Sequence, residues 1–228
     1  MRVPQAEATK GSQKWIQLLV NECRPVFASA LAPHLPTELA QRITWLSPLR
    51  EDEYAEYRDA DFLARLGINC PNVPLRRFWP ARGPQWDALG RASASGPFFL
   101  VEAKANVPEL VSSCSARAPR SLRLIREGLR ATRDMHGCRA SIDWMSGFYQ
   151  HANRLAHLHF LRALNAINAY MIFLYFLNDD THLPTSRDEW GGALALQKKL
   201  MGLNGPKSRE SVIELFIDVK QLGQEPHP

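Results

Sequence analysis

The chain has 228 residues, of which 45% are hydrophobic and 22% are charged, and its formal net charge is +5. These values are ordinary for a soluble globular protein, and the length supports a full hydrophobic core. The four cysteines show no Cys-x-x-Cys or Cys/His spacing, which argues against a structural zinc site and a secreted disulfide scaffold. The positive charge permits a polyanionic partner without requiring one.

Neither the first residues nor the apolar runs suggest entry into a membrane. The opening segment "MRVPQAEATKGSQKW" contains no apolar core of a signal peptide. The longest apolar run, residues 169–177, is too short to cross a bilayer as a helix. We therefore expect a cytoplasmic protein without a membrane partner.

The first 67 residues are predicted to be mainly helical. Residues 12–32 have the pattern of an amphipathic helix that is kinked or broken at Pro25. A short helix is expected after Pro36. Residues 50–67 form a stronger candidate, because acidic residues begin the segment and Gly67 ends it.

Strands are expected next, at residues 75–80, 85–91 and 97–105, separated by turn-forming residues. The last two are close enough in the chain to form a hairpin. The remaining expected elements are helices at 119–135 and 142–164, a strand at 169–178, a helix at 186–203 and a strand at 211–220. This order predicts an α/β fold in which helices flank a mixed central sheet.

Charged residues lie on both strands of the expected hairpin. Residues i and i+2 of a strand share a face, so Glu102 and Lys104 point to one side and Val101 and Ala103 to the other. Neighbouring strands are about 5 Å apart, so Asp87 on the first strand can approach Glu102. Two carboxylates and a backbone carbonyl suit Mg²⁺, and a lysine beside them can stabilise an attacking water or the developing charge. The pattern favours phosphodiester cleavage.

The stretch "GPQWDALGR…FFLVEAKAN" resembles the PD-(D/E)XK nuclease superfamily, whose motif is an aspartate at a strand start, a variable spacer and (Asp/Glu)-x-Lys on the next strand. Asp87, Glu102 and Lys104 take these three positions. Trp86, rather than proline, precedes Asp87, and Pro84 stands three residues before it.

The family's core order of helix, three strands, helix and strand matches residues 50–178 in sequence. The resemblance therefore implies a restriction-endonuclease-like three-layer fold with extra N-terminal helices. It divides the chain into an N-terminal helical extension at 1–48 and a nuclease-like domain at 49–228, in one compact unit overall.

The same resemblance implies a nuclease that depends on Mg²⁺ or Mn²⁺ and acts on DNA. Asp87 and Glu102 would hold the metal with the carbonyl of Ala103, and Lys104 would orient or polarise the hydrolytic water. A homodimer fits, because this fold usually pairs two sites to cut two strands. Two alternatives stay open: a nucleic-acid-binding or assembly protein that does not cut, and an unrelated protein with an acidic ligand pocket. In those cases Glu102 and Lys104 form a salt bridge on a half-exposed strand.

Many members of the superfamily add a glutamate from the helix before the strands. On the expected helix at 50–67, Glu56 and Asp59 share a face with Leu63 and Leu66. Both carboxylates are therefore candidates for a further metal contact. The alternative is that they flank the apolar stripe in solvent.

A row of arginines follows one face of the expected helix at 119–135. The row consists of Arg120, Arg123, Arg126, Arg130 and Arg133, at spacings of three, three, four and three. Guanidinium groups bind phosphates in a bidentate way, so we expect this row to contact the DNA backbone. The alternative is a solvated surface helix.

The expected helix at 142–164 carries a polar stripe on an otherwise apolar surface. The stripe consists of Gln150, Asn153, Arg154 and His157. In several branches of the superfamily a polar residue of this helix reaches the site, so we expect Gln150 to be catalytic and Arg154 to contact nucleic acid. Hydrogen bonds between helices are the alternative.

Overall fold

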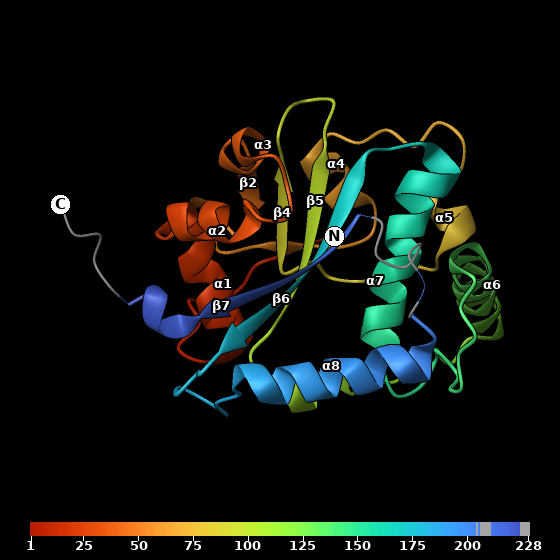
Figure 1. Cartoon of the computed structure of the whole chain (residues 1–228). Helices are drawn as coiled ribbons and strands as arrows, with labels where there is room; N and C mark the ends of the chain where they lie inside the picture. The colour runs from red at the N-terminus through yellow and green to blue at the C-terminus, as the bar shows by residue number, and fades with distance from the viewer. Residues whose placement is uncertain (204, 206–210, 224–228) are drawn as a thin grey trace.

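A five-stranded mixed sheet forms the centre of the protein (Figure 1). This computed structural model describes residues 1–203, 205 and 211–223. In sheet order the strands are β2 (Thr44–Ser47), β4 (Ala88–Arg91), β5 (Phe98–Lys104), β6 (Ala169–Leu177) and β7 (Val212–Asp218). The first three are antiparallel neighbours, and β5, β6 and β7 run parallel. The predicted α/β fold with helices around a mixed sheet is therefore confirmed.

Three N-terminal helices cover one face of this sheet. They are α1 (Gly11–Asn21), α2 (Arg24–Leu31) and α3 (Thr37–Gln41). The predicted break near Pro25 is confirmed, because Pro25 lies in the first turn of α2, where its missing N–H is tolerated. Leu19 and Phe27 of these helices share a buried apolar cluster with Val101 and Ala103 of β5.

The longer helices lie on the opposite face. They are α6 (Pro119–His136), α7 (Tyr149–His159, continued by a π-helical turn at Phe160–Leu164) and α8 (Arg187–Met201). Ile125 of α6, Leu155 of α7 and Trp190 of α8 belong to the same apolar cluster as Leu100 of β5 and Phe173 of β6. Figure 1 shows α7 between the sheet and α6, whereas α8 crosses at one end of the strands. None of the helices in the described ranges is long and apolar enough to cross a membrane.

The predicted continuous helix at 50–67 is wrong. The segment is divided into a 3-10 turn (Arg50–Asp52), β3 (Glu56–Tyr57), which pairs with β1 (Arg2–Val3), and α4 (Ala60–Leu66). Glu53, Tyr54 and Asp59 have positive φ angles, which a right-handed helix cannot accommodate.

The predicted strand at 75–80 is also wrong, because residues Leu75–Phe78 form the short helix α5. Phe78 and Trp79 are adjacent in sequence, yet both are buried and both pack edge-on against His157 of α7. Consecutive residues of a strand point to opposite faces, so a strand could not bury both rings in this way.

The strand that completes the antiparallel part of the sheet is therefore β2. This strand is short and was not expected from the sequence, although Trp45 within it is buried. The proposed boundary after residue 48 follows β2, so the N-terminal segment supplies a strand as well as helices.

The helix expected from residue 142 begins only at Tyr149, after Gly147 with φ +78°. The elements expected at 85–91, 97–105, 119–135, 169–178, 186–203 and 211–220 are present with small shifts of their ends.

Candidate active site

The pairing of β4 with β5 brings Asp87 to Glu102. The ladder's last pair is Ala88 with Val101, so Asp87 and Glu102 are the next residues along the two strands. The N–H of Asp87 donates to the carbonyl of Val101 at 3.2 Å, and Asp87 Oδ2 accepts from the N–H of Ala103 at 2.7 Å. The N–H and C=O of a strand residue point to the same neighbouring strand, so the carbonyl of Ala103 also points toward Asp87.

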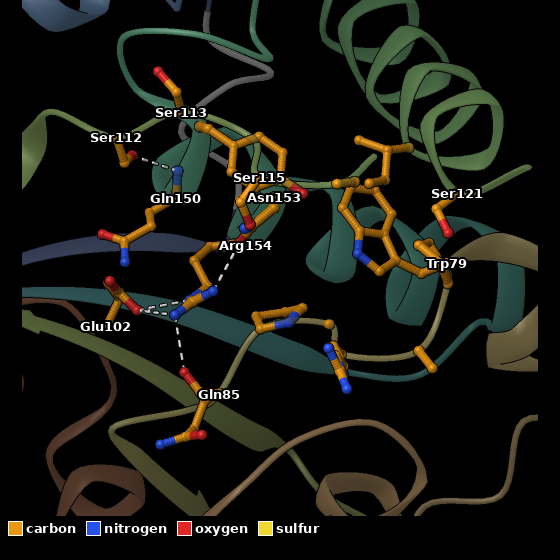
Figure 2. Close-up of a pocket in the computed structure, with 18 of the residues that line it drawn as sticks. Trp79, Gln85, Glu102, Ser112, Ser113, Ser115, Ser121, Gln150, Asn153 and Arg154 are labelled. Atoms are coloured by element: carbon orange, nitrogen blue, oxygen red, sulfur yellow. Dashed lines mark hydrogen bonds and ion pairs between the residues drawn. The ribbon is translucent and has the colours of Figure 1, made fainter. Parts of the chain in front are cut away.

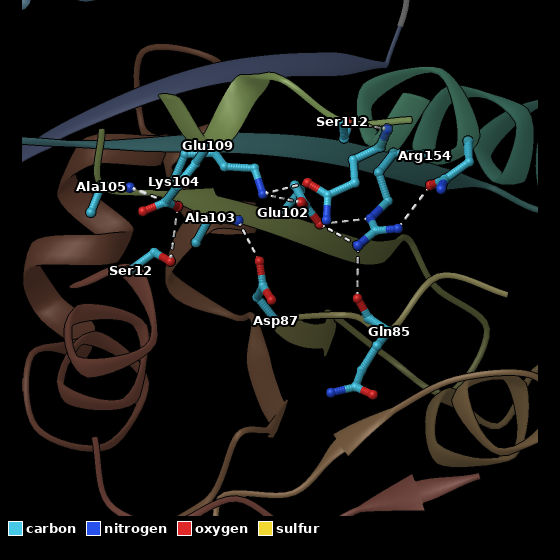
Figure 3. Close-up of polar contacts among 12 residues, drawn as sticks. Ser12, Gln85, Asp87, Glu102, Ala103, Lys104, Ala105, Glu109, Ser112 and Arg154 are labelled. Carbon is cyan, nitrogen blue, oxygen red and sulfur yellow. Dashed lines mark hydrogen bonds and ion pairs between the residues drawn. The ribbon is translucent and has the colours of Figure 1, made fainter. Parts of the chain in front are cut away.

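Glu102 is the centre of a network of ion pairs (Figure 3). It is 3% exposed, and its Oε1 lies 2.7 Å from Nζ of Lys104. Its Oε2 accepts from Nε of Arg154 at 2.6 Å. Lys104 also donates to Oε1 of Gln150 at 2.9 Å. Gln150 and Arg154, which the sequence placed on one stripe of α7, therefore both reach the carboxylate–lysine pair.

Glu56 and Asp59, the two acidic residues predicted as further metal contacts, lie in different places, and only Glu56 lines the cleft. Glu56 is buried on β3, accepts a hydrogen bond from Nε2 of Gln85 at 2.5 Å and lines the same cleft as Asp87 and Glu102. Asp59 instead accepts a hydrogen bond from the N–H of Gly83 at 3.0 Å, and it is not among the residues that line this cleft. Glu56 therefore comes from a strand rather than a helix, and Asp59 fixes the loop before β4.

The three carboxylates titrate differently because their neighbours differ. Burial raises the pKa of Asp87 well above its usual range, and the charges of Glu102 and Glu56 raise it further. Burial likewise raises the pKa of Glu56. Burial alone would raise the pKa of Glu102, but Arg154 and Lys104 outweigh it and hold that pKa below its usual value. The site thus has one carboxylate that is already paired and two that would be stabilised by added positive charge.

Lys104 stays protonated at neutral pH. Burial by itself would lower the pKa of its ammonium group, but the carboxylates of Glu102 and Asp87 raise that pKa above its usual value. A lysine in this state contributes charge and hydrogen bonds, and it does not act as a general base.

The three carboxylates, Lys104 and Arg154 form the floor of a cleft of about 760 Å³ (Figure 2). One wall is the segment 79–85 before β4, and the other is the segment 112–121 that leads into α6. Hydroxyl and guanidinium groups line these walls: Ser112, Ser113, Ser115, Ser121, Arg82 and Arg117. Ser12 of α1 also lines the cleft. These wall residues were not predicted from the sequence, although the run "SSCSAR" soon after β5 is a signal that could have revealed the wall at 112–121.

The predicted arginine row lies mainly outside this cleft. The predicted helix is confirmed as α6, and it is amphipathic as expected. Ile125 and Leu129 are buried, whereas four arginines of the row are exposed: Arg120, Arg123, Arg126 and Arg130. Arg133 is half-buried, with its guanidinium 6.0 Å from the ring centre of Trp144. Of the row, only Arg120 lines a described cavity, a smaller one beside the cleft.

Arg154 has a different environment from the other arginines proposed to bind nucleic acid. The residue is 5% exposed, and its guanidinium donates to the carbonyl of Gln85 at 2.9 Å and to Oδ1 of Asn153 at 2.8 Å, in addition to Glu102. The guanidinium is therefore part of the floor of the cleft.

In the described part of the chain, no three His, Cys, Asp or Glu side chains are grouped so that they could hold a metal ion. The candidate ligand set instead contains two carboxylates, Asp87 and Glu102, and the carbonyl of Ala103. Comparisons with protein-family models, with curated proteins and with solved structures found no match.

Proposed function

We propose that the protein is a divalent-metal-dependent nuclease that hydrolyses phosphodiester bonds in DNA, with a site of the PD-(D/E)XK type on a restriction-endonuclease-like fold. The observation that carries the proposal is the placement of Asp87 opposite Glu102 at the end of the β4–β5 ladder, with Lys104 on the same face as Glu102. The cleft above them presents hydroxyl and guanidinium groups, which suit a phosphate ester.

The ligand set fits Mg²⁺ or Mn²⁺. Both prefer oxygen ligands, and Mg²⁺ in particular is held by one or two carboxylates while it keeps several waters. Glu102 already makes one contact with Lys104, through Oε1, and two with Arg154, through Oε2, but an ionised carboxylate has about four lone-pair sites, so one position remains, on Oε1. Asp87, whose pKa is raised by burial and by neighbouring charge, would be stabilised by a cation beside it.

Each residue then has a defined task. The oxygen of a water molecule forms a bond to phosphorus, the bond from phosphorus to the leaving oxygen breaks, and one proton passes from the water to solvent while the leaving oxygen takes one up. A bound divalent cation supplies polarisation of the phosphate and a lower pKa of the water. Lys104, fixed between Glu102 and Gln150, stabilises negative charge on the phosphate oxygens. Arg154 keeps Glu102 ionised and oriented.

The proposed activity requires a nucleic-acid partner, and we place the protein in the cytoplasm. The homodimer expected from paired cleavage is necessary only if the enzyme cuts both strands of a duplex.

A second candidate function is binding of nucleic acid without cleavage. It is favoured by one observation: both oxygens of Glu102 are already bonded to cationic side chains, Oε1 to Lys104 and Oε2 to Arg154. In a binding protein these pairs would stabilise the fold, and the walls of the cleft would hold the phosphates.

Calorimetric titration of Mg²⁺ and Mn²⁺, combined with a cleavage assay, separates the two functions. We expect the wild-type protein to bind the metal and to cut single-stranded circular DNA. Asp87→Ala should lose both activities, and Lys104→Ala should bind metal but not cut. Asp59→Asn is the matched control, because this carboxylate lies outside the cleft and the amide can still accept from Gly83. Absence of metal binding by the wild type, with DNA present, would favour the binding protein.

A further inference from the structure

A second cavity of about 240 Å³ adjoins the cleft over the start of α6. The two cavities share four lining residues, Trp79, Pro80, Ala81 and Ser121. Figure 2 shows Trp79 and Ser121 together on one side of the cleft, away from Glu102 and Arg154. The cavities therefore form one continuous groove that leads from the carboxylates outward, between α5 and the first turn of α6.

Positive charge follows this groove. Arg82 and Arg117 line the cleft, Arg76 and Arg120 line the smaller cavity, and all four side chains are exposed. Among the described residues that line either cavity, carboxylates occur only on the floor, at Glu56, Asp87 and Glu102. The outer part of the groove is therefore cationic, and the charge that it would bind extends beyond a single phosphate.

The wall opposite Arg82 is held next to the floor. Oγ of Ser112 accepts from the N–H of Gln150 at 2.8 Å, and Gln150 in turn accepts from Lys104. Ser113 and Ser115, in the same wall, are exposed and line the cleft. Their hydroxyls can both donate and accept, so they suit phosphate oxygens and the edges of unpaired bases.

The depth of the carboxylates in the cleft favours a single-stranded substrate over a double helix. A cleft of about 760 Å³ is within the range of about 300–1,000 Å³ that encloses one small ligand, and Glu102 at its floor is 3% exposed. Because Glu102 is buried at the floor, the scissile phosphate has to enter the cleft, which is easier for a flexible single strand than for a phosphate held in a stacked double helix. A single strand is narrow enough, and cationic grooves that track the backbone are typical of proteins that bind single strands.

Given the nuclease function proposed above, we infer that the substrate is single-stranded DNA or the single-stranded end of a duplex. The scissile phosphate lies over Asp87 and Glu102. The strand continues past Arg82 and Arg117 and leaves over Arg76 and Arg120. The row Arg123, Arg126 and Arg130 farther along α6 does not contact it.

Binding and cleavage are measured separately to test this. The probes are a fluorescein-labelled 15-nucleotide oligothymidylate and a blunt 15-base-pair duplex, bound in EDTA so that no metal-dependent cleavage occurs. We expect the wild-type protein to bind the single strand at least tenfold more tightly than the duplex. Each phosphate contact on a single strand contributes about 0.7 to the slope of log K against log salt, so Arg76→Ala/Arg120→Ala should reduce that slope by about 1.4.

The matched control is Arg126→Ala/Arg130→Ala, which removes two exposed arginines of the same helix that line neither cavity. It should leave affinity within twofold and the slope unchanged. Equal or tighter binding of the duplex, no binding of either probe, or equal effects of the two double variants would each overturn the inference. These outcomes are distinct from failure of the proposed nuclease, in which the single strand is bound as expected but is not cut with Mg²⁺ or Mn²⁺.

Discussion

Arg154 and Glu102 form a buried ion pair in which two nitrogens of the guanidinium share one carboxylate oxygen: Nε and a terminal nitrogen lie 2.6 and 2.5 Å from Oε2. The contact joins α7 to β5, elements that are separated by α6 in the chain. The site as a whole has an excess of acidic groups, because two cations, Arg154 and Lys104, face three carboxylates. The excess of negative charge is largest at Asp87, which is where an added cation would be held.

Arg154→Met tests how far this contact maintains the fold. The substitution leaves Oε2 of the buried Glu102 without its cationic partner, although Lys104 still pairs with Oε1, and we expect a loss of about 3 kcal/mol in the free energy of unfolding at pH 7. The folded-state pKa of Glu102 is lowered, so its stabilising effect is present above its unfolded pKa and is lost as pH falls through the folded value. The difference between variant and wild type should therefore narrow below about pH 4.

Urea unfolding at several pH values measures this difference. Arg123→Met is the control, because its pair with Glu127 is exposed, with 3.9 Å between the charged atoms, and should contribute at most about 0.5 kcal/mol. Equal losses for the two arginines would contradict the assignment of Arg154 to a buried, stabilising pair.

Asp87→Asn should stabilise the protein in the absence of metal. The folded-state pKa of Asp87 is raised, so any favourable effect of its protonated form is present at low pH and is lost as pH rises through that folded value. Above it, the ionised side chain is repelled by Glu102 and Glu56. Asparagine removes the charge while its oxygen can still accept from Ala103, so we expect a gain of about 1 kcal/mol near pH 8, or about 3 °C in Tm.

Thermal unfolding in EDTA, from pH 4 to pH 8, checks the Asp87→Asn prediction. The gain should decrease toward pH 4, and added Mg²⁺ or Mn²⁺ should stabilise the wild type but not the variant. A variant that is less stable than the wild type at pH 8 would show that the carboxylate is not under electrostatic strain.

The sequence predicted the parts of the site that depend on local patterns. Strand alternation placed Glu102 and Lys104 on one face, and helical spacing placed Gln150 and Arg154 on one stripe. Their mutual contacts follow once α7 packs against β5. The origin of Glu56 could not be predicted in this way, because the acidic start of residues 50–67 is typical of a helix. The predicted helix is interrupted because Glu53, Tyr54 and Asp59 have positive φ angles and because β3 pairs with β1, near the distant N-terminus.

The arginine row shows what helical spacing cannot predict, namely the position of a helix relative to the site. Spacing correctly indicated an amphipathic helix with arginines on its outer face, but it contains no information about which end of the helix lies near the carboxylates. That depends on the course of residues 105–118. In the structure the first turn of α6 borders the groove, so Arg117 and Arg120 are near it.

Gly202→Ala and Gly137→Ala should differ greatly, although both glycines end helices with positive φ, at +75° and +63°. Either substitution introduces left-handed strain of about 1 kcal/mol. A Cβ on Gly202 would also lie 2.6 Å from the backbone carbon of Arg139, whereas a Cβ on Gly137 meets nothing within 4 Å. Overpacking costs about 1–3 kcal/mol more, so we expect a loss of about 3 kcal/mol for Gly202→Ala and about 1 kcal/mol for Gly137→Ala. Similar losses in urea unfolding would show that the 139–140 backbone moves away readily.

Gln197 and Gln17 are both buried glutamines, but replacement by methionine should have opposite effects. Both polar atoms of the Gln197 amide lack a hydrogen-bond partner among the described residues, as does the hydroxyl of Tyr175, which lines the same small cavity behind Lys104. Gln17 instead accepts from the N–H of Ala8 at 2.8 Å and donates to the carbonyl of Ala6 at 3.0 Å.

A buried polar group without a partner carries a desolvation penalty of about 1–3 kcal/mol, which methionine of similar length removes. We therefore expect Gln197→Met to raise the free energy of unfolding by about 1 kcal/mol. Gln17→Met should lower it by about 1–2 kcal/mol, because it removes two hydrogen bonds that each contribute about 1 kcal/mol, to the backbone of Ala6 and Ala8. Denaturant unfolding of the two variants gives the signs directly. If Gln197→Met destabilises the protein as much as Gln17→Met, the amide has a partner in solution, and an ordered water in the cavity between Gln197, Tyr175 and Lys104 is the group that would provide it.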